Sequence, residues 1–502
     1  MIHSLKISFK KYYDLFWLSG ICVLAIILRL DHLSLRPLWL DEACIANPLA
    51  NSLKNSWQGI IDSGNNAAYF YLLKLWSLLF GDSESALRSL SVVLSLLSII
   101  AIYKFGAHLW EKIVGRWAAF LLAINYFSIF YAIQARHYSL VILLSILSYY
   151  YFYILLDNKK LKTVICYVLF TTLGIYTHPW FLLLLASQLI FSLFYGKIIK
   201  ILISQTLAIF LSLPWIIVLW HYRMNGANNW IGLTSIKTLI DTFHYFAYGS
   251  VAVYILFGLI SATLIIGYFE STKERIYYKF NNINFHLDRR LALLINYLLF
   301  PLLVALIIGR FIPFYEAGRY EAIVLPAFIL LFALLFSRLK NRIIIGLLIV
   351  LLIFFSYSEV RQERNYIISD TVNERSAALN LLSLAEDGDQ IVFTGLSRPT
   401  IEYYLNHLNS DQKKIKKYSF PKGMEQHPAY QDIEAIIRNN GNAMPSADSL
   451  IQKIKSDKAG RVWLVFTGDN PFASSLKEEF DKQFKEQGYL PGPNYLIILY
   501  KL

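Results

Sequence analysis

Long apolar runs separated by short polar connectors fill most of the chain before its last third. Runs of about 20 apolar residues match a membrane-spanning helix, and within a bilayer only helices and closed barrels satisfy the backbone polar groups. The pattern therefore predicts an α-helical polytopic membrane protein with about 11–13 transmembrane helices. We locate eleven clear spans, at about Leu15–Leu30, Ser89–Phe105, Trp117–Ile133, Leu140–Leu156, Val164–Thr177, Trp180–Tyr195, Ile198–Trp220, Phe246–Phe269, Leu291–Ile312, Tyr320–Phe336 and Ile343–Phe355.

One further apolar segment, Ala67–Gly81, either spans the membrane or lies at its surface. It is short and carries Lys74 at its centre, where a Lys costs roughly 2.5–3.5 kcal/mol on insertion scales. If this segment does not span the membrane, the connectors rich in Lys and Arg all lie on the same side as the N-terminus. Basic connectors favour the cytoplasmic side, so this placement agrees with the rule. These segments are residues 1–14, 104–116, 157–162, 196–200, 270–290 and 338–342.

We therefore expect Ala67–Gly81 to be an interfacial amphipathic helix between the first two spans. The same charge distribution predicts a cytoplasmic N-terminus and an extracytoplasmic C-terminus in the plasma (inner) membrane. Leu15–Leu30 follows Lys10 and Lys11 but precedes no small-residue cleavage site, so we interpret it as an uncleaved anchor.

The composition changes at about Glu359, where charged residues become frequent and apolar runs shorten. This predicts two domains: a transmembrane domain at 1–358, with a first outer loop at 31–88, and an extracytoplasmic domain at 359–502. In the second domain, strands alternate with helices, which indicates an α/β layer structure. Strands are expected at Asp389–Gly395, Arg461–Gly468 and Tyr495–Leu502, and helices at Asn373–Ala385, Thr400–His407, Ser449–Lys455 and Ser474–Gln487.

Composition limits the possible functions. The chain is 56% hydrophobic and has a net charge of +13, and the positive excess lies in the membrane part. It reports orientation and headgroup contact and gives no indication of nucleic acid binding. Of the three cysteines, only Cys44 falls in a loop, so neither a disulfide framework nor a Cys-based zinc site is expected. No cofactor is predicted, and no spacing resembles a metal-binding signature.

Candidate chemistry gathers in the segments predicted on the outer face. Asp41 and Glu42 form an adjacent pair in the first outer loop, and we expect them to be catalytic. The alternative for them is a pair of solvated loop acids, and for the basic residues it is snorkelling at the interface. Arg provides a planar fork suited to phosphate oxygens. The expected substrate-binding residues are Lys74, Arg88, Arg136, His137, Tyr138, His178, Arg319 and Tyr320.

Outward-facing carboxylates and arginines on a lipid-facing helix bundle favour chemistry on a lipid-linked anionic substrate. The reaction that fits is transfer of a sugar from a polyprenyl-phosphate donor to an acceptor hydroxyl, with a carboxylate as general base and Arg, Tyr or His donors on the departing phosphate. A single displacement inverts the anomeric centre. We favour Asp41 as the base because its shorter side chain is placed more rigidly, but composition does not separate it from Glu42.

Five segments, in order along the chain, resemble a known family: RPLWLDEA, LLFGDSESALRSLSVV, FYAIQARHYSL, YTHPWF and GRYEAIVLPA. They are similar to the class C glycosyltransferases of the protein O-mannosyltransferase type, in particular the bacterial branch with the aminoarabinose and galacturonic acid transferases that act on lipopolysaccharide. The resemblance covers roughly residues 15–340. It implies that Asp41 is the catalytic residue and that Arg136, Tyr138, Arg319 and Tyr320 lie near the lipid phosphate.

The chain departs from this family just before the expected interfacial helix. Many members have His-Pro-Pro there, whereas this chain has Asn65, Asn66 and Ala67. The contacts to the acceptor or to the donor headgroup are therefore expected to differ.

Three other functions fit parts of the pattern. A glycolipid transporter would place ionisable residues near the bilayer midplane and often shows repeats. A lipid-linked glycan ligase or polymerase would need a larger outer loop, and a non-catalytic envelope protein would use Asp41 and Glu42 structurally. The sequence identifies neither the sugar nor the acceptor, which is a glycan, a glycolipid or a protein.

Overall fold

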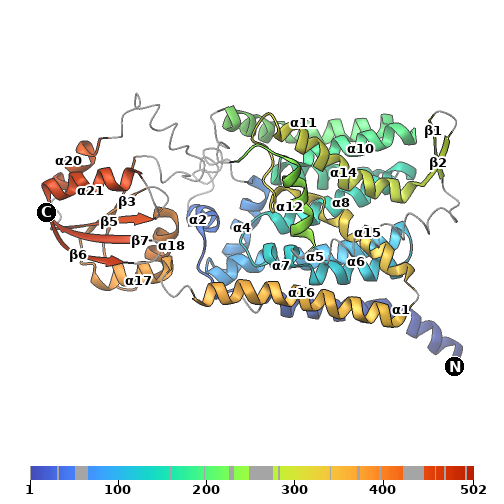
Figure 1. Cartoon of the computed structure of the whole chain (residues 1–502), viewed down its shortest axis with the longest axis horizontal. Coiled ribbons are helices and arrows are strands. Elements are labelled where there is room, and N and C mark those ends of the chain that lie inside the picture. Colours follow the sequence, from blue (N-terminus) through green and yellow to red (C-terminus); the bar gives the residue numbers. More distant parts are fainter. Residues whose placement is uncertain are drawn as a thin grey trace.

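A computed structural model of the chain describes most of its residues, with gaps between the described ranges. Those ranges are residues 2–30, 33–50, 66–158, 160–196, 198–224, 231–247, 275–280, 283–339, 341–369, 373–394, 397–421, 446–457, 460–467, 471–491 and 495–502. The predicted fold class is confirmed, because a bundle of long apolar helices is followed by a small α/β domain. Figure 1 shows the helices side by side along the long axis of the molecule, with the sheet of the α/β domain beyond one end of the bundle.

Within the described ranges, six helices are long and apolar enough to cross a membrane, and a bent pair makes a seventh. The long helices are α1 (Ile2–Leu30), α5 (Glu84–Leu109), α8 (Tyr138–Asp157), α11 (Ile198–Met224), α14 (Arg289–Gly309) and α16 (Arg342–Ser369). Shorter elements are α2 (Leu40–Ala46), η1 (Asn47–Ala50), α4 (Ala67–Phe80), α9 (Leu161–Thr177), α10 (Phe181–Tyr195), α12 (Ile236–Phe246), η2 (Tyr320–Ile323) and α15 (Leu325–Arg338). A two-stranded hairpin, β1 (Arg275–Phe280) with β2 (Ile283–Asp288), precedes α14. The span predicted at Phe246–Phe269 lies almost wholly outside the described residues.

The span predicted as one helix over Trp117–Ile133 is broken. It consists of α6 (Lys112–Ile124) and α7 (Tyr126–Ala132), which meet at 59°. Side chains from other helices satisfy the carbonyl groups that the break leaves without helical partners. The buried Arg29 donates to the Ala123 carbonyl at 2.8 Å and to Ser128 Oγ at 3.1 Å, and Ser356 donates to the Ile124 carbonyl at 2.6 Å.

Helix α4 occupies the segment whose placement in the membrane the sequence left open. Its 14 residues span about 21 Å, which is less than the roughly 30 Å of a bilayer core. Lys74 lies buried on this helix and donates from Nζ to the Leu49 carbonyl at 2.8 Å. An interfacial position for α4 remains a prediction, and the length of the helix agrees with it.

The C-terminal domain contains one five-stranded sheet in the order β4-β3-β5-β7-β6. Strands β4, β3 and β5 are parallel, and β7 pairs antiparallel with β5 and β6. The strands are β3 (Gln390–Thr394), β4 (Lys416–Phe420), β5 (Arg461–Thr467), β6 (Lys485–Pro491) and β7 (Tyr495–Lys501). The helices are α17 (Glu374–Leu384), α18 (Arg398–Leu408), α20 (Asp448–Ser456) and α21 (Pro471–Gln483).

The three predicted strands correspond to β3, β5 and β7, and the predicted helices to α17, α18, α20 and α21. The helix expected at Ser474–Gln487 is wrong at its end, because α21 stops at Gln483 and β6 follows. Strands β4 and β6 were missed because both lie at sheet edges, where polar side chains replace the apolar run of a central strand.

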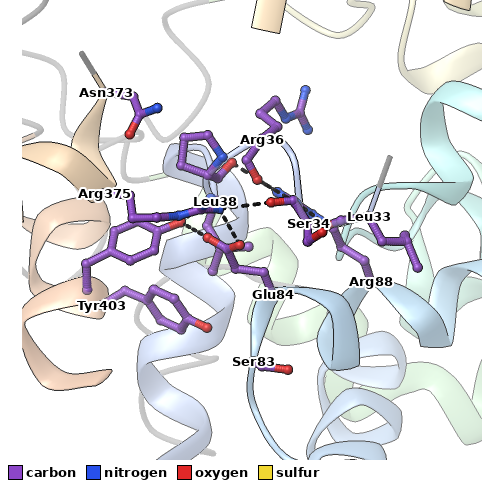
Figure 2. Close-up of polar contacts among 12 residues, drawn as sticks. Leu33, Ser34, Arg36, Leu38, Ser83, Glu84, Arg88, Asn373, Arg375 and Tyr403 are labelled. Carbon is purple, nitrogen blue, oxygen red and sulfur yellow. Dashed lines mark hydrogen bonds and ion pairs between the residues drawn. The ribbon is translucent and has the colours of Figure 1, made fainter. Parts of the chain in front are cut away.

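The C-terminal domain is tied to the first loop of the membrane domain (Figure 2). Arg375 of α17 points between Glu84 and the loop, with Nη2 at 2.5 Å from Glu84 Oε2 and 3.2 Å from the Ser34 carbonyl. Tyr404 of α18 donates to Glu84 and accepts the backbone N–H of Leu38 at 2.6 Å. These contacts fix the loop just before Asp41.

We expect Tyr404→Phe to lower the free energy of unfolding by about 1–3 kcal/mol, because it leaves the Leu38 N–H and Glu84 without the hydroxyl that both contact. Unfolding of the purified full-length protein in detergent measures this. Tyr489 is 63% exposed, so Tyr489→Phe serves as the control with no expected change. An equal response of the two variants would contradict the assigned role of Tyr404.

Candidate active site

Glu42 is the buried anchor of the first loop. Helix α2 begins at Leu40, so Asp41 and Glu42 lie in its first turn, where negative charge is favourable. Glu42 Oε1 accepts from Arg88 Nε at 2.9 Å and from the Ala135 N–H at 2.7 Å, and its Oε2 accepts from Arg88 Nη2 at 2.6 Å. Burial alone would raise the pKa of Glu42, but the charge of Arg88 outweighs it and the pKa is lowered. Glu42 is therefore an ionised structural carboxylate.

Arg88 uses its other N–H groups to hold the same loop. It donates to the carbonyl groups of Leu33, Arg36 and Pro37 at 2.7, 2.7 and 3.0 Å. Arg88 is fully buried. The sequence grouped it with the substrate-binding residues, but its contacts fit support of the Asp41 loop.

Asp41, in contrast, faces two arginines from distant parts of the chain. Its Oδ2 lies 3.3 Å from Arg136 Nη2 and 3.6 Å from Arg319 Nη1. Arg136 also donates from Nη1 to the Asp41 carbonyl at 3.2 Å. The Asp41 side chain is 14% exposed and that of Arg319 is 31% exposed, so this ion-pair cluster borders the surface.

Neighbouring residues form a closed circle around the site, through Arg136, His137, His178, Tyr320, Arg319 and Asp41, and we call this circle the ring. His137, which follows Arg136, stacks on His178 with ring centroids 5.5 Å apart. His178 meets Tyr320 edge to face at 5.0 Å, and Tyr320 follows Arg319. The ring of Trp39 lies 5.4 Å from the Arg319 guanidinium. The structure thus brings together the predicted residues Asp41, Arg136, His137, His178, Arg319 and Tyr320.

Both histidines of this ring are neutral near pH 7. Burial, reinforced by the charge of Arg136, lowers the pKa of His137 well below its ordinary value. The same two causes lower the pKa of His178 to about 3. The positive charge of the ring therefore comes from its arginines.

Tyr138 and Lys74 have other surroundings. The ring of Tyr138 is buried 4.1 Å from Tyr131 and 4.3 Å from His137, so it packs behind the histidine. Lys74 contacts the end of the first loop through the Leu49 carbonyl. Direct substrate contacts of Tyr138 and Lys74 remain predictions.

The residues that aim Arg319 were not among the predicted catalytic or substrate-binding residues. Glu321 is buried and accepts the backbone N–H groups of Gly318 at 2.5 Å and Arg319 at 3.1 Å. Gly318 has φ +87°, where other residues are strained, and Tyr131 donates to its carbonyl. The available signal was Gly318 beside Arg319, because Gly is the residue that most readily adopts a backbone with positive φ.

Cys44 corrects an expectation. The sequence placed this thiol in a loop, but it lies in α2 and is buried. Burial and the nearby Asp41 raise its pKa to about 12. Since the thiolate is the reactive form, Cys44 is expected to be inert toward thiol reagents.

Among the described residues, no three His, Cys, Asp or Glu side chains gather as a metal ion requires. The acidic residues nearest the ring are engaged by arginines or by backbone N–H groups, as described above.

Comparison with known proteins adds three findings. The model of the dolichyl-phosphate-mannose-protein mannosyltransferase family matches residues 67–221, which include Arg136, His137 and His178. ArnT from Cupriavidus metallidurans, solved bound to undecaprenyl phosphate, is similar with a TM-score of 0.64 and 10% identity over 96% of this chain and 98% of that one. The oligosaccharyltransferase AglB from Archaeoglobus fulgidus is similar with a TM-score of 0.50 and 13% identity over 91% of this chain and 70% of that one.

No curated protein matches the sequence. The structural likeness extends over nearly the whole chain, whereas the family match covers helices α4 to α11 of the membrane domain. The two findings agree on one class and confirm the resemblance predicted from the sequence. The chain has the fold of the class C glycosyltransferases of the ArnT and protein mannosyltransferase type, and fold and family match together indicate a glycosyltransferase.

Proposed function

We propose that the protein transfers a single sugar from a polyprenyl-phosphate donor to an acceptor hydroxyl at the extracytoplasmic membrane surface. The observation that carries this is the pair of arginines at Asp41. This carboxylate borders the surface, and its Oδ2 lies 3.3 Å from Arg136 Nη2 and 3.6 Å from Arg319 Nη1. A phosphodiester of a lipid and a sugar is negatively charged, and two guanidinium groups at one place suit its oxygens.

The geometry supports a single displacement with Asp41 as the base. When the donor phosphate takes up the arginine N–H groups, Asp41 is released from its ion pairs to accept the proton of the acceptor hydroxyl. The acceptor oxygen then bonds to the anomeric carbon, and the bond from that carbon to the phosphate oxygen breaks. The electron pair goes to the phosphate, whose charge rises from −1 to −2 and is stabilised by Arg136 and Arg319. The anomeric centre is inverted.

The two similar structures support a lipid phosphate as part of the donor. ArnT is described with undecaprenyl phosphate, and AglB with a dolichol phosphate and an inhibitory peptide. The shared element of these descriptions is the polyprenyl phosphate, whereas a peptide is named only for AglB. The donor lipid is therefore better supported for this chain than any particular acceptor.

Glu42 is assigned a positioning role. It is fully buried, and both its oxygens are held by Arg88 and backbone N–H groups. Of the adjacent carboxylates, Asp41 is the one that borders the surface and faces the phosphate-binding arginines.

Replacing the base tests the mechanism directly. Asp41→Asn keeps the size of the side chain but removes proton acceptance, so the transfer rate should fall at least about 100-fold. Transfer from radiolabelled undecaprenyl-phosphate sugars to acceptors in native membranes measures the rate. The exposed Asp411 provides the control, Asp411→Asn, with no expected change. Near-normal transfer by a folded Asp41→Asn protein would overturn the assignment.

The arginines are tested by binding. Arg136→Ala and Arg319→Ala should each weaken binding of undecaprenyl phosphate about 10-fold or more. A Lys at either position should restore only part of the lost affinity, because Lys lacks the planar fork of the guanidinium group. Binding to the purified full-length variants in nanodiscs gives the dissociation constant. Arg310→Ala is the control, since Arg310 is exposed at the end of α14. Unchanged affinity in both ring variants would make them interfacial residues without a phosphate-binding role.

Orientation is tested by a single added thiol. Asp411 is 70% exposed in the C-terminal domain, so the cysteine of Asp411→Cys should react with an impermeant maleimide in right-side-out vesicles. Lys112→Cys, at the opposite membrane side in the proposed topology, should react only in inside-out vesicles. The unsubstituted protein sets the background, since Cys44 is buried while Cys22 and Cys166 are partly buried within helices α1 and α9. The reverse pattern of labelling would invert the topology.

A further inference from the structure

Asn66, part of the sequence that departs from the related family, contacts the ring of residues around Asp41. Its amide Nδ2 lies 2.7 Å from His137 Nδ1. Asn66 is also the N-cap residue of α4, yet its side chain makes no capping hydrogen bond. Asn is favoured at N-caps because its side-chain oxygen accepts backbone N–H groups of the first turn. Here the side chain turns to the histidine, so helix capping does not account for it.

This contact determines which nitrogen of His137 carries the proton. The imidazole of His137 is neutral near pH 7, because burial and then the charge of Arg136 lower its pKa. A neutral imidazole has one N–H and one acceptor nitrogen, and an amide nitrogen only donates. Since Asn66 Nδ2 donates to Nδ1, the proton of His137 lies on Nε2.

The Nε2–H of His137 has no hydrogen-bond partner within the described part of the chain, although the nitrogen is buried. A buried donor without a partner is unfavourable, and such groups mark sites that a ligand or water completes. His137 follows Arg136 in the sequence, and its imidazole stacks on that of His178. Its free N–H therefore belongs to the same site as the arginines that face Asp41.

We propose that Asn66 holds His137 as the Nε2–H tautomer, so that His137 donates a hydrogen bond to a phosphate oxygen of the lipid donor. The proposal rests on the proposed function and adds a specific contact to it. A neutral donor suits this position because Arg136 and Arg319 already bring two guanidinium groups to the site. A third cation would bind the doubly charged product more strongly than the donor and slow its release. Asn66 is a positioning residue, and His137 contacts the substrate.

Two amide substitutions distinguish the ring nitrogens. The amide nitrogen of Gln lies about where Nε2 lies in His, and that of Asn about where Nδ1 lies. Binding of undecaprenyl phosphate to the full-length protein in nanodiscs should therefore weaken about 10-fold in His137→Asn. His137→Gln should restore most of the affinity. Weaker binding by the Gln variant than by the Asn variant would overturn the proposal.

Asn66 is tested by a double-mutant cycle. Asn66→Leu should weaken binding a few-fold in the natural sequence but have no further effect in His137→Gln, because Asn66 acts only through the imidazole. The exposed Asn380 of α17 provides the control, Asn380→Leu, which should leave binding unchanged in both backgrounds. Equal effects of Asn66→Leu in the two backgrounds would show that it does not act through His137.

The tautomer is also read without any substitution. In protein labelled with ¹⁵N histidine, the His137 ring should show a protonated Nε2 and an unprotonated Nδ1, with the signals assigned by their loss in His137→Gln. The opposite pattern overturns the proposal even if variants fail to fold.

The outcomes separate this inference from the proposed function. If the unsubstituted protein does not bind undecaprenyl phosphate, the proposed donor is wrong and the inference falls with it. If that protein binds and all variants bind equally, only the inference is wrong. If lipid phosphate binding is unchanged in His137→Asn but the KM for the sugar-carrying donor rises, His137 contacts the sugar and the phosphate assignment is overturned.

Discussion

The buried ion pair between Glu42 and Arg88 is the interaction on which the site depends. Removing two charges from water is costly and is offset only when geometry and further hydrogen bonds are good. Here Arg88 binds both oxygens of Glu42 and three loop carbonyl groups, while Glu42 also accepts the Ala135 N–H. The pair therefore joins α5, the first loop and the segment before Arg136. That arrangement sets Asp41 opposite Arg136.

Glu42 and Asp41 show how neighbouring carboxylates acquire separate roles from their surroundings. Glu42 points into the protein and pairs with the buried Arg88, with Arg36 Nη2 also at 3.7 Å, so it contributes rigidity. Asp41 lies at the border of the surface and faces two arginines, so a ligand at the surface can reach the same guanidinium groups. The C-terminal domain reinforces this division, because Tyr404 holds the backbone of Leu38 just before α2.

Much of this arrangement followed from the sequence, because apolar runs dictate membrane helices and buried strands whatever their partners. The strands β3, β5 and β7 have such apolar runs. The placing of Asp41, Arg136 and Arg319 in one site was expected from the family resemblance, and the structure brings the three side chains together. Edge strands β4 and β6 lack an apolar run. The break between α6 and α7 depends on Arg29, a residue distant in sequence, and local pattern carries no trace of such a contact.

Four arginines that look alike in the sequence have different partners in the structure. In the sequence, Arg29, Arg88, Arg136 and Arg319 all lie at ends of apolar segments and look alike. Their partners distinguish them: Arg29 binds helix-end carbonyl and hydroxyl groups, and Arg88 binds Glu42. Arg136 and Arg319 instead share one carboxylate that borders the surface. An arginine enclosed by buried protein groups stabilises the fold, whereas two arginines that face one carboxylate at the border of the surface are placed where a phosphate can reach them.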